Sequence, residues 1–287
     1  MEKGLDSDAQ RADFIATRSS ARLGDCMRVV AVVNQKGGVG KTTTAVNLGH
    51  ALAQSGRRVL LADLDPQSHL AACMGIRNPE CIGMDSVLVH AGEMSDHVIG
   101  SRENLSLVPA GSGLGEFEYL EGGVERALVL RDSLAGVAAS TDIVLLDCAP
   151  STGMLMVNAI AAADDVLIPM AGDYLSLTGL ARLMLTLKRL QALRKKGSRE
   201  WMFFSRFTPR RRLSQEVYAK VMKHFPGHLL CGAIQEAAAL AECAGAGKTI
   251  FEYRRSSRSA REFTALANDL LNERVVGHER ETSSHVA

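Results

Sequence analysis

The stretch RVVAVVNQKGGVGKTT, residues 28–43, decides the fold of this chain. Its first six residues form an apolar run rich in β-branched side chains, which is typical of a strand buried on both faces. The loop NQKGGVGK follows, and the next residues read as a helix that ends near Gly56. A glycine-rich loop with a lysine between a strand and a helix indicates phosphate binding, because its N–H groups and the helix N-terminus attract an anion.

Further apolar runs follow this stretch and alternate with helical segments. They occupy residues 58–63, 105–108, 142–147, 165–169, 201–207 and 229–234. This alternation predicts an α/β fold, a doubly wound and mostly parallel twisted sheet with helices on both faces. In the helix expected after residues 165–169, one face carries the apolar side chains and the opposite face carries Arg182 and Arg189. The apolar face consists of Leu180, Leu183, Met184, Leu187 and Leu190.

Length and composition are those of a soluble globular protein. The 287 residues, 46% hydrophobic and 23% charged, suffice for one large domain, which we expect at residues 27–273. We expect a flexible polar arm at 1–26 and a polar tail at 274–287. Met27 directly precedes the first strand, which raises the alternative that translation begins there. No apolar stretch approaches the roughly 18 residues of a membrane span, and the first residues lack a signal-peptide core, so we expect a cytoplasmic protein.

Residues 36–43 carry the phosphate-binding chemistry. The backbone of Gly37, Gly38, Val39 and Gly40 is expected to surround phosphate oxygens together with Thr43 at the helix start. Lys41 supplies a positive charge to the β- and γ-phosphates, and the Thr42 hydroxyl is a Mg²⁺ ligand. The sequence therefore predicts ATP and Mg²⁺ as ligands.

The loop departs from the ordinary phosphate-loop pattern at two positions. Gln35 replaces the first glycine, and Lys36 adds a second lysine. In this the loop resembles that of the ParA/MinD family of deviant Walker A ATPases, and Asn34-Gln35 resembles the ParA branch. The likeness extends through most of residues 28–272. It implies a weak ATPase stimulated by a partner protein, and an ATP-dependent homodimer in which Lys36 reaches the phosphates of the partner subunit.

Two carboxylates extend the resemblance. Asp63-Leu64-Asp65-Pro66-Gln67 resembles the family's D-x-D-P-Q element, which implies that Asp65 positions the attacking water and is catalytic together with Lys36 and Lys41. Asp147 ends the apolar run at 142–147, at the sheet edge where ligands bind in such folds. It is similar to the Walker B aspartate that holds Mg²⁺. The resemblance also suggests an adenine site at Phe204, Ser205, Arg206 and Gln235.

Cysteine usage raises one alternative from the same superfamily. Cys148-Ala149-Pro150-Ser151 resembles the family's D-x-P-P-S stretch, with Ala149 in place of the first proline. A cysteine there is compatible with an iron–sulfur reductase or metallochaperone. No second cysteine lies near it in sequence, and the six cysteines are scattered, so we expect small buried side chains instead.

Positive charge concentrates in one region. Between Arg182 and Lys223 there are 13 Lys and Arg against two Glu, whereas the whole chain has a net charge of +1. Such a segment indicates a surface for nucleic-acid phosphates. We expect nonspecific DNA binding in the ATP state, DNA segregation or cargo positioning on the nucleoid, and a ParB-like adaptor. The DNA-contact candidates are Arg189, Arg206, Arg210, Arg211 and Arg212.

Two features leave another partner open. The family's I-P-R-N-x-R-L-S stretch appears here from Ile234, with Glu236 and Ala239 in place of two arginines of the family's DNA-binding surface. A protein partner is therefore an alternative to DNA. A MinD-like membrane partner is not expected, because residues 275–287 form no apolar helical face. The sequence does not name the cargo.

Overall fold

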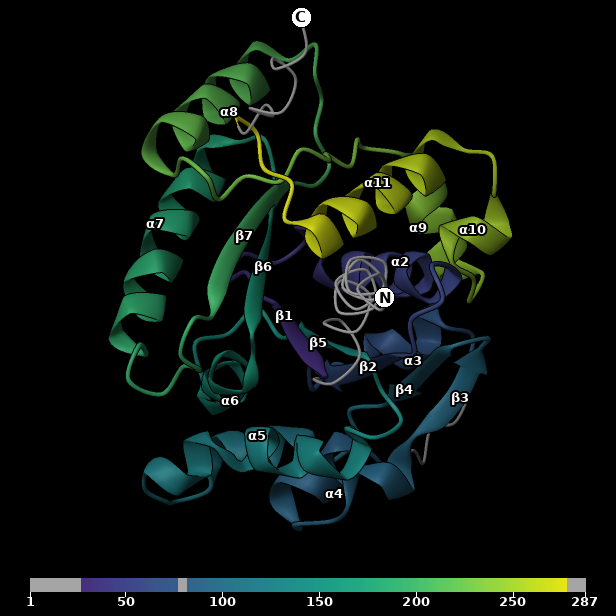
Figure 1. Ribbon diagram of the computed structural model, residues 1–287, viewed down its shortest axis with the longest axis vertical. Helices are drawn as coiled ribbons and strands as arrows, with labels where there is room; N and C mark the ends of the chain where they lie inside the picture. The colour runs from purple at the N-terminus through teal and green to yellow at the C-terminus, as the bar shows by residue number, and fades with distance from the viewer. Residues whose placement is uncertain (1–26, 77–81, 278–287) are drawn as a thin grey trace, which may run out of the picture.

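Seven strands build one central sheet in the computed structural model, which describes residues 27–76 and 82–277 (Figure 1). They are β1 (Arg28–Val32), β2 (Val59–Leu64), β3 (Ile99–Arg102), β4 (Leu105–Val108), β5 (Ile143–Cys148), β6 (Asp165–Met170) and β7 (Arg199–Phe204). Their order is β3-β4-β2-β5-β1-β6-β7. Neighbouring strands are parallel except β3 and β4. The predicted doubly wound, mostly parallel fold is confirmed.

Helices cover both faces of this sheet (Figure 1). One face is packed by α2 (Lys41–Gln54), α3 (His69–Cys73), α9 (Ala238–Gly245), α10 (Ile250–Tyr253) and α11 (Arg258–Asn272). The other is packed by α4 (Met84–Val89), α5 (Val129–Ser133), α6 (Met154–Ala162), α7 (Tyr174–Arg189) and α8 (Arg212–His224). Short 3₁₀ turns lie at η2 (Met94–His97), η3 (Leu114–Tyr119), η4 (Val124–Ala127) and η5 (Leu134–Val137).

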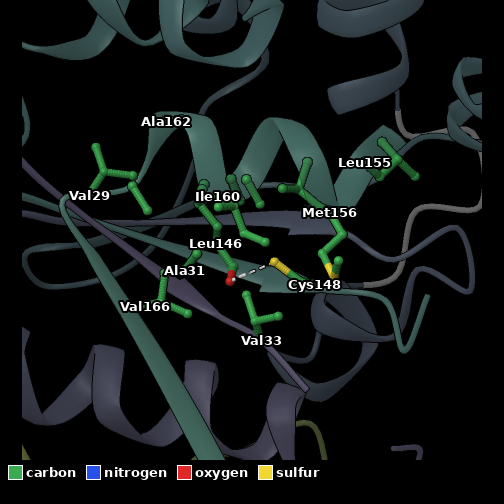
Figure 2. Close-up of a cluster of buried hydrophobic side chains, with 14 of the residues drawn as sticks. Val29, Ala31, Val33, Leu146, Cys148, Leu155, Met156, Ile160, Ala162 and Val166 are labelled. Atoms are coloured by element: carbon green, nitrogen blue, oxygen red, sulfur yellow. Dashed lines mark hydrogen bonds between the residues drawn. The ribbon is translucent and has the colours of Figure 1, made fainter. Parts of the chain in front are cut away.

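Side chains of successive strand residues point to opposite faces of the sheet, which creates two separate hydrophobic cores. In β1, Val30 and Val32 face the α2 side, whereas Val29 and Ala31 face the α6 side. Figure 2 shows the α6 side, where helix residues such as Ile160 pack over the strands. Cys148 belongs to this core, and burial raises the pKa of its thiol well above the ordinary value. The apolar run of the opening stretch is therefore a central strand buried on both faces.

The helix expected after residues 165–169 is α7, and its predicted orientation is confirmed. Leu180, Leu183 and Leu187 are buried, and Arg182 and Arg189 are exposed. The aspartate before it, Asp173, caps the helix by accepting a hydrogen bond from the N–H of Ser176 at 2.9 Å. No helix in the described ranges 27–76 and 82–277 has the length and apolar character needed to cross a membrane.

Two strand predictions differ from the structure. The edge strand β3 was not predicted, because IGSR is short and contains glycine. Residues 229–234 form no continuous ladder with β7. Leu229 makes an isolated bridge to Met202 of β7, whereas Leu230 bridges Val275 and the following Gln235 bridges Phe207. The ladder breaks because the N–H groups of Cys231 and Gly232 donate instead to the carbonyl of Arg274 and the carboxylate of Asp269.

The expected terminal segments are described only in part. The arm at 1–26 and the last residues, 278–287, lie outside the described residues. The start of the expected tail, however, packs against the body of the protein. Val275 is buried and pairs with Leu230, and the N–H of Val276 donates to the carbonyl of Leu229. The start of the predicted tail thus contacts residues of the predicted domain.

Candidate nucleotide-binding site

The phosphate loop connects β1 to α2 at the carboxyl edge of the sheet. Gly38 and Gly40 have φ angles of +72° and +86°, a region that glycine adopts without the strain of a side chain. Gly40 is also the N-cap of α2, and no side chain of the described residues caps the N–H groups of the first turn. The loop and helix start therefore present unpaired backbone donors of the kind that bind phosphate.

Lys41 lies beneath this loop and is only 7% exposed. Its Nζ donates to the carbonyl of Lys36 at 3.3 Å. Burial lowers the pKa of Lys41, although Asp147 acts in the opposite direction. A buried ammonium with one neutral acceptor is poorly solvated, which favours an anionic ligand beside it.

Asp147 is the penultimate residue of β5, and it lies level with Val32 of β1 and Asp63 of β2. Both carboxylate oxygens are buried and have no hydrogen-bond partner among the described residues. Burial raises the pKa of Asp147 to about 7, and the nearby Thr42 hydroxyl and Lys41 ammonium only partly offset this effect. An unpaired buried carboxylate next to a threonine hydroxyl fits a Mg²⁺ site, since Mg²⁺ prefers oxygen ligands and retains water and phosphate ligands.

Replacing Asp147 with asparagine is expected to stabilise the nucleotide-free protein. Its folded-state pKa of about 7 lies above the ordinary value of 3.8, so folding favours the protonated carboxyl. The stability that this preference provides is fully present below about pH 4. That contribution is lost as pH rises through 7, where the wild type buries a charge and asparagine does not. We expect a Tm about 2–5 °C higher at pH 8 and a smaller gain at pH 5.5, measured by scanning calorimetry. Asp96→Asn, at an exposed position, is the control; a variant less stable than wild type at both pH values contradicts the prediction.

Asp63 lies beside the candidate site and was not predicted from the sequence as a site residue. Its fully buried carboxylate accepts the N–H of Asp65 at 3.0 Å and that of Leu70 at 3.2 Å. Burial and the neighbouring Asp147 raise its pKa well above the ordinary value. Asp63 thus shapes the loop that carries Asp65, and its position two residues before Asp65 was the only signal available.

Asp65 lines a cavity of about 790 Å³ together with the phosphate loop, large enough for a nucleotide. Its Oδ1 accepts the N–H of Gln67 at 3.0 Å. Part of the cavity wall is apolar and was not predicted from the sequence. It consists of Ile234, Ala237, Ala238, Leu240, Ala241, Ala244 and Phe263.

The four residues predicted to contact adenine lie in different places in the structure. Ser205 and Arg206 line the cavity. Phe204 is buried in the α6-side core, where it packs against Phe207 and Tyr218. Gln235 does not line the cavity. An adenine ring would therefore meet the apolar wall rather than the side chains of Phe204 and Gln235.

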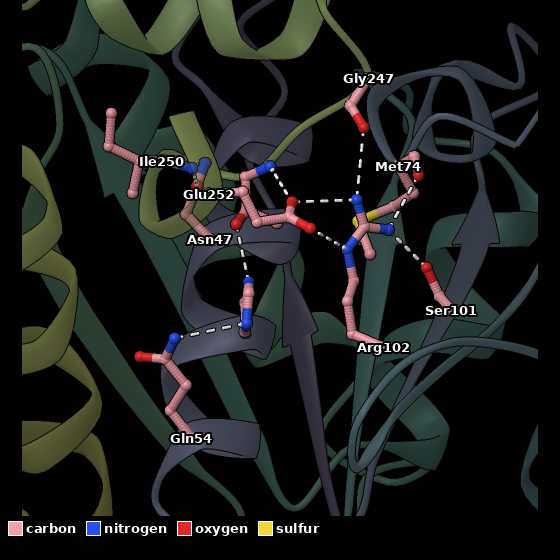
Figure 3. A network of polar contacts seen from close by, with 10 residues as sticks. Asn47, Gln54, Met74, Ser101, Arg102, Gly247, Ile250 and Glu252 are labelled. Atoms are coloured by element: carbon pink, nitrogen blue, oxygen red, sulfur yellow. Dashed lines mark hydrogen bonds and ion pairs between the residues drawn. The ribbon is translucent and has the colours of Figure 1, made fainter. Parts of the chain in front are cut away.

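A polar network joins the segment that follows α9 to β3 and to the phosphate-loop helix α2 (Figure 3). On the edge strand, Arg102 donates from Nε and Nη2 to the Glu252 carboxylate, each at 3.0 Å. It also donates to the carbonyl of Gly247 at 3.2 Å. On α2, the Asn47 side chain accepts the N–H of Ile250 at 2.7 Å. The segment from the end of α9 through α10 is thus anchored to both β3 and α2.

Lys36 is engaged within its own chain. Its Nζ donates to Asp173 Oδ2 at 2.5 Å and lies 3.5 Å from the Ser176 hydroxyl. Burial acts to raise the pKa of Asp173, but the bonds from Lys36 and Ser176 outweigh it and leave that pKa below the ordinary value. Lys36 must therefore leave this carboxylate before it can reach a ligand on another subunit.

The predicted DNA residues do not form one cluster. Arg210 and Arg211 are exposed next to Arg212, where α8 begins, and Arg206 precedes them at the end of β7. Arg189 is exposed at the C-terminal end of α7, and this helix of 16 residues is about 24 Å long. The two groups lie toward opposite edges of the sheet.

Ion pairs also reduce the positive charge counted in the sequence. Five of the 13 basic residues between 182 and 223 pair with acids in the fold. The partners are Glu200 for Arg194, Asp164 for Lys195, Asp165 for Arg199, Glu236 for Arg206 and Glu216 for Arg212. The exposed positive surface is therefore smaller than the net of +11 suggests.

Comparison with known proteins identifies the family of this chain. A family model described as an AAA domain matches residues 27–198. The chromosome partitioning protein ParA of Myxococcus xanthus is 34% identical over 252 residues, which cover 85% of this chain and 88% of that protein. The chain belongs to the ParA/MinD family. The same family accounts for the second lysine of the phosphate loop.

Solved structures agree with this assignment. A Mycobacterium smegmatis protein described as cobyrinic acid a,c-diamide synthase, with bound ADP and magnesium, has a TM-score of 0.74 and 29% identity. The match covers 86% of this chain and 95% of that one. The ATP complex of a variant of Cyanothece McdA has a TM-score of 0.78 at 23% identity, covering 87% and 98%. The latter supports the fold of this ParA/MinD-family chain.

Proposed function

We propose that this chain is a ParA-type ATPase that binds MgATP in the cavity beside the phosphate loop, dimerises with ATP and hydrolyses it slowly. The observation that carries the proposal is Asp147, whose buried carboxylate has no hydrogen-bond partner among the described residues. It lies at the same sheet edge as the buried Lys41 and the free N–H groups of α2. A magnesium–phosphate ligand would satisfy all three groups together.

Each part of the nucleotide has a matching surface. The N–H groups of the loop and Lys41 would hold the phosphates, Thr42 and Asp147 would hold Mg²⁺, and the apolar wall would contact the base. Bound Mg²⁺ would neutralise phosphate charge. The solved relative described with ADP and magnesium supports this assignment.

Hydrolysis would rest on Asp65. It is partly buried, lines the cavity and is held by the loop that Asp63 shapes. Phosphoryl transfer depends mainly on positioning and charge stabilisation, so a carboxylate that orients water is sufficient for slow turnover. Stimulation by a ParB-like adaptor is part of the proposal and follows from the family.

In the cytoplasm, the ATP dimer would bind the DNA of the nucleoid through an exposed basic surface. Arg210, Arg211 and Arg212 are exposed basic residues at the start of α8, and Lys220 and Lys223 extend the surface along this helix. Dimerisation brings two such surfaces together, which strengthens binding to a continuous duplex without base contacts. The ParA relative supports a role in DNA segregation or cargo positioning.

Replacing Arg210, Arg211 and Arg212 together with alanine is expected to weaken binding to every duplex by about tenfold or more at roughly 100 mM salt. Each lost phosphate contact also removes released counterions, so the slope of log affinity against log salt should become shallower by about one per contact. The measurement is fluorescence anisotropy with ATP and with ADP on two unrelated duplexes.

The matched control is Lys188→Ala, an exposed basic position at the far end of α7. We expect near wild-type DNA affinity from it. A wild-type ATP dimer that does not bind DNA at low salt contradicts the DNA assignment.

A protein partner is the second candidate. It is favoured by Glu236, which stands where the family has an arginine and forms an ion pair with Arg206 at 2.7 Å. Ala239 removes a second family arginine from the same region. In the DNA experiment above, absence of DNA binding by an intact ATP dimer supports this candidate.

A further inference from the structure

Two consecutive carbonyls of the phosphate loop are bonded to the end of β7. Ser205 Oγ donates to the carbonyl of Val39 at 2.6 Å, and Arg206 Nη1 donates to the carbonyl of Gly38 at 3.1 Å. In a planar trans peptide, the C=O and the following N–H point in opposite directions. Fixing these carbonyls therefore directs the N–H groups of Val39 and Gly40 away from β7. Neither N–H donates to a protein acceptor within the described ranges, so both are free for an anion.

Arg206 is held in place from several directions. Its Nη2 donates to Glu236 Oε1 at 2.7 Å while Nη1 bonds the loop, so one guanidinium joins two segments. Its backbone has φ +52°, a left-handed conformation that is rare without glycine and persists only where neighbours impose it. The flanking backbone does so, because the N–H of Ser205 donates to Met170 and that of Phe207 to Ile234.

We propose that Arg206 and Glu236 form a strut that positions the phosphate loop, a role that rests on the proposed function of that loop. A guanidinium presents several donors in a rigid fork and can bridge Gly38 and Glu236, whereas a lysine ammonium is a flexible point charge. The glutamate at position 236, where the family has an arginine, supplies the partner. Arg206 is thereby assigned to nucleotide binding and withdrawn from the DNA surface.

Glu236→Gln and Arg206→Lys are the informative variants, because both nearly preserve side-chain size. The first weakens only the link between Arg206 and Glu236, and the second also weakens the bond to the Gly38 carbonyl. We expect KM for ATP and Kd for ADP to rise about threefold to fivefold, the range of an exposed charged contact, with kcat within about twofold. Glu236→Asp, which retains the charge, should recover part of the affinity. The double variant should be less than additive, because both changes break the same strut. Kd is measured by calorimetry and kcat by phosphate release.

The matched control is Glu242→Gln, which breaks another exposed pair, with Arg254 at 3.3 Å, outside the cavity lining. It should leave KM and Kd unchanged. Equal effects of Glu242→Gln and Glu236→Gln would overturn the proposal.

Backbone NMR relaxation in the nucleotide-free protein gives a second measurement that does not depend on activity. Order parameters of the loop at 37–40 should be lower in Glu236→Gln and Arg206→Lys than in wild type, with the central strands unchanged. Unchanged order parameters and unchanged affinity overturn the strut while leaving the proposed function intact. A wild-type protein that binds no nucleotide overturns the proposed function instead, and the comparison of order parameters still judges whether the strut holds the loop.

Discussion

Replacing Lys41 with alanine is expected to lower ATP and ADP affinity by at least about 100-fold and to abolish turnover. The ammonium is the buried positive charge beside Asp147 at the phosphate end of the cavity, and each charged hydrogen bond to phosphate contributes about 1.5–3 kcal/mol. Nucleotide affinity is measured by calorimetry and turnover by phosphate release.

Folding does not confound this test. Burial already disfavours the charged lysine, which donates only one hydrogen bond within the described structure, so alanine should cost the nucleotide-free protein little stability. Thermal unfolding checks this point. Lys248→Ala removes an exposed lysine outside this cavity and is the control. Unchanged ATP affinity in a folded Lys41→Ala variant would falsify the phosphate-loop assignment.

The second large effect concerns the switch between monomer and dimer. Asp65→Ala is expected to bind ATP and remain dimeric, since the water would no longer be oriented, with turnover reduced about 100-fold or more. Lys36→Ala is expected to bind ATP and remain monomeric, because no positive charge would reach the partner's phosphates. Light scattering with ATP and with ADP distinguishes these states.

Two further variants make this result specific. Asp65→Asn retains an oxygen that can accept the N–H of Gln67, so its loss of turnover cannot be attributed to the loop bond. Asp173→Asn removes the carboxylate that holds Lys36 at 2.5 Å and should dimerise at lower ATP concentration. Dimerisation of Lys36→Ala with ATP would remove the proposed cross-subunit role.

Much of the fold followed from local sequence. Residues 29–32 of β1 and 143–146 of β5 are continuously apolar because both faces of a central parallel strand are covered, and this pattern is visible without a structure. The short edge strand β3 was not predicted, and the strand predicted at 229–234 is broken in the structure. Their pairing depends on distant groups such as Asp269 and Arg274, which no local pattern reveals.

The candidate site divides in the same way. Gly38, Gly40 and Lys41 were assigned from the sequence because backbone conformation and charge in one loop are local properties. The apolar wall of the cavity was not, because α9 and α11 reach it only after the chain has crossed the sheet. Phe204 was misplaced for a related reason, since strand alternation sends it to the core and Ser205 to the loop.

The sequence by itself determined that this protein has a phosphate loop with two lysines on a parallel α/β sheet, because strand burial, glycine conformation and residue order are encoded within a few turns of chain. Only the tertiary structure decided which groups each charged side chain contacts. Lys36 meets Asp173 at a separation of 137 residues, and Arg206 meets Gly38 at 168 and Glu236 at 30. Such contacts depend on where whole elements pack, and a charge pattern read along the chain contains no information about them.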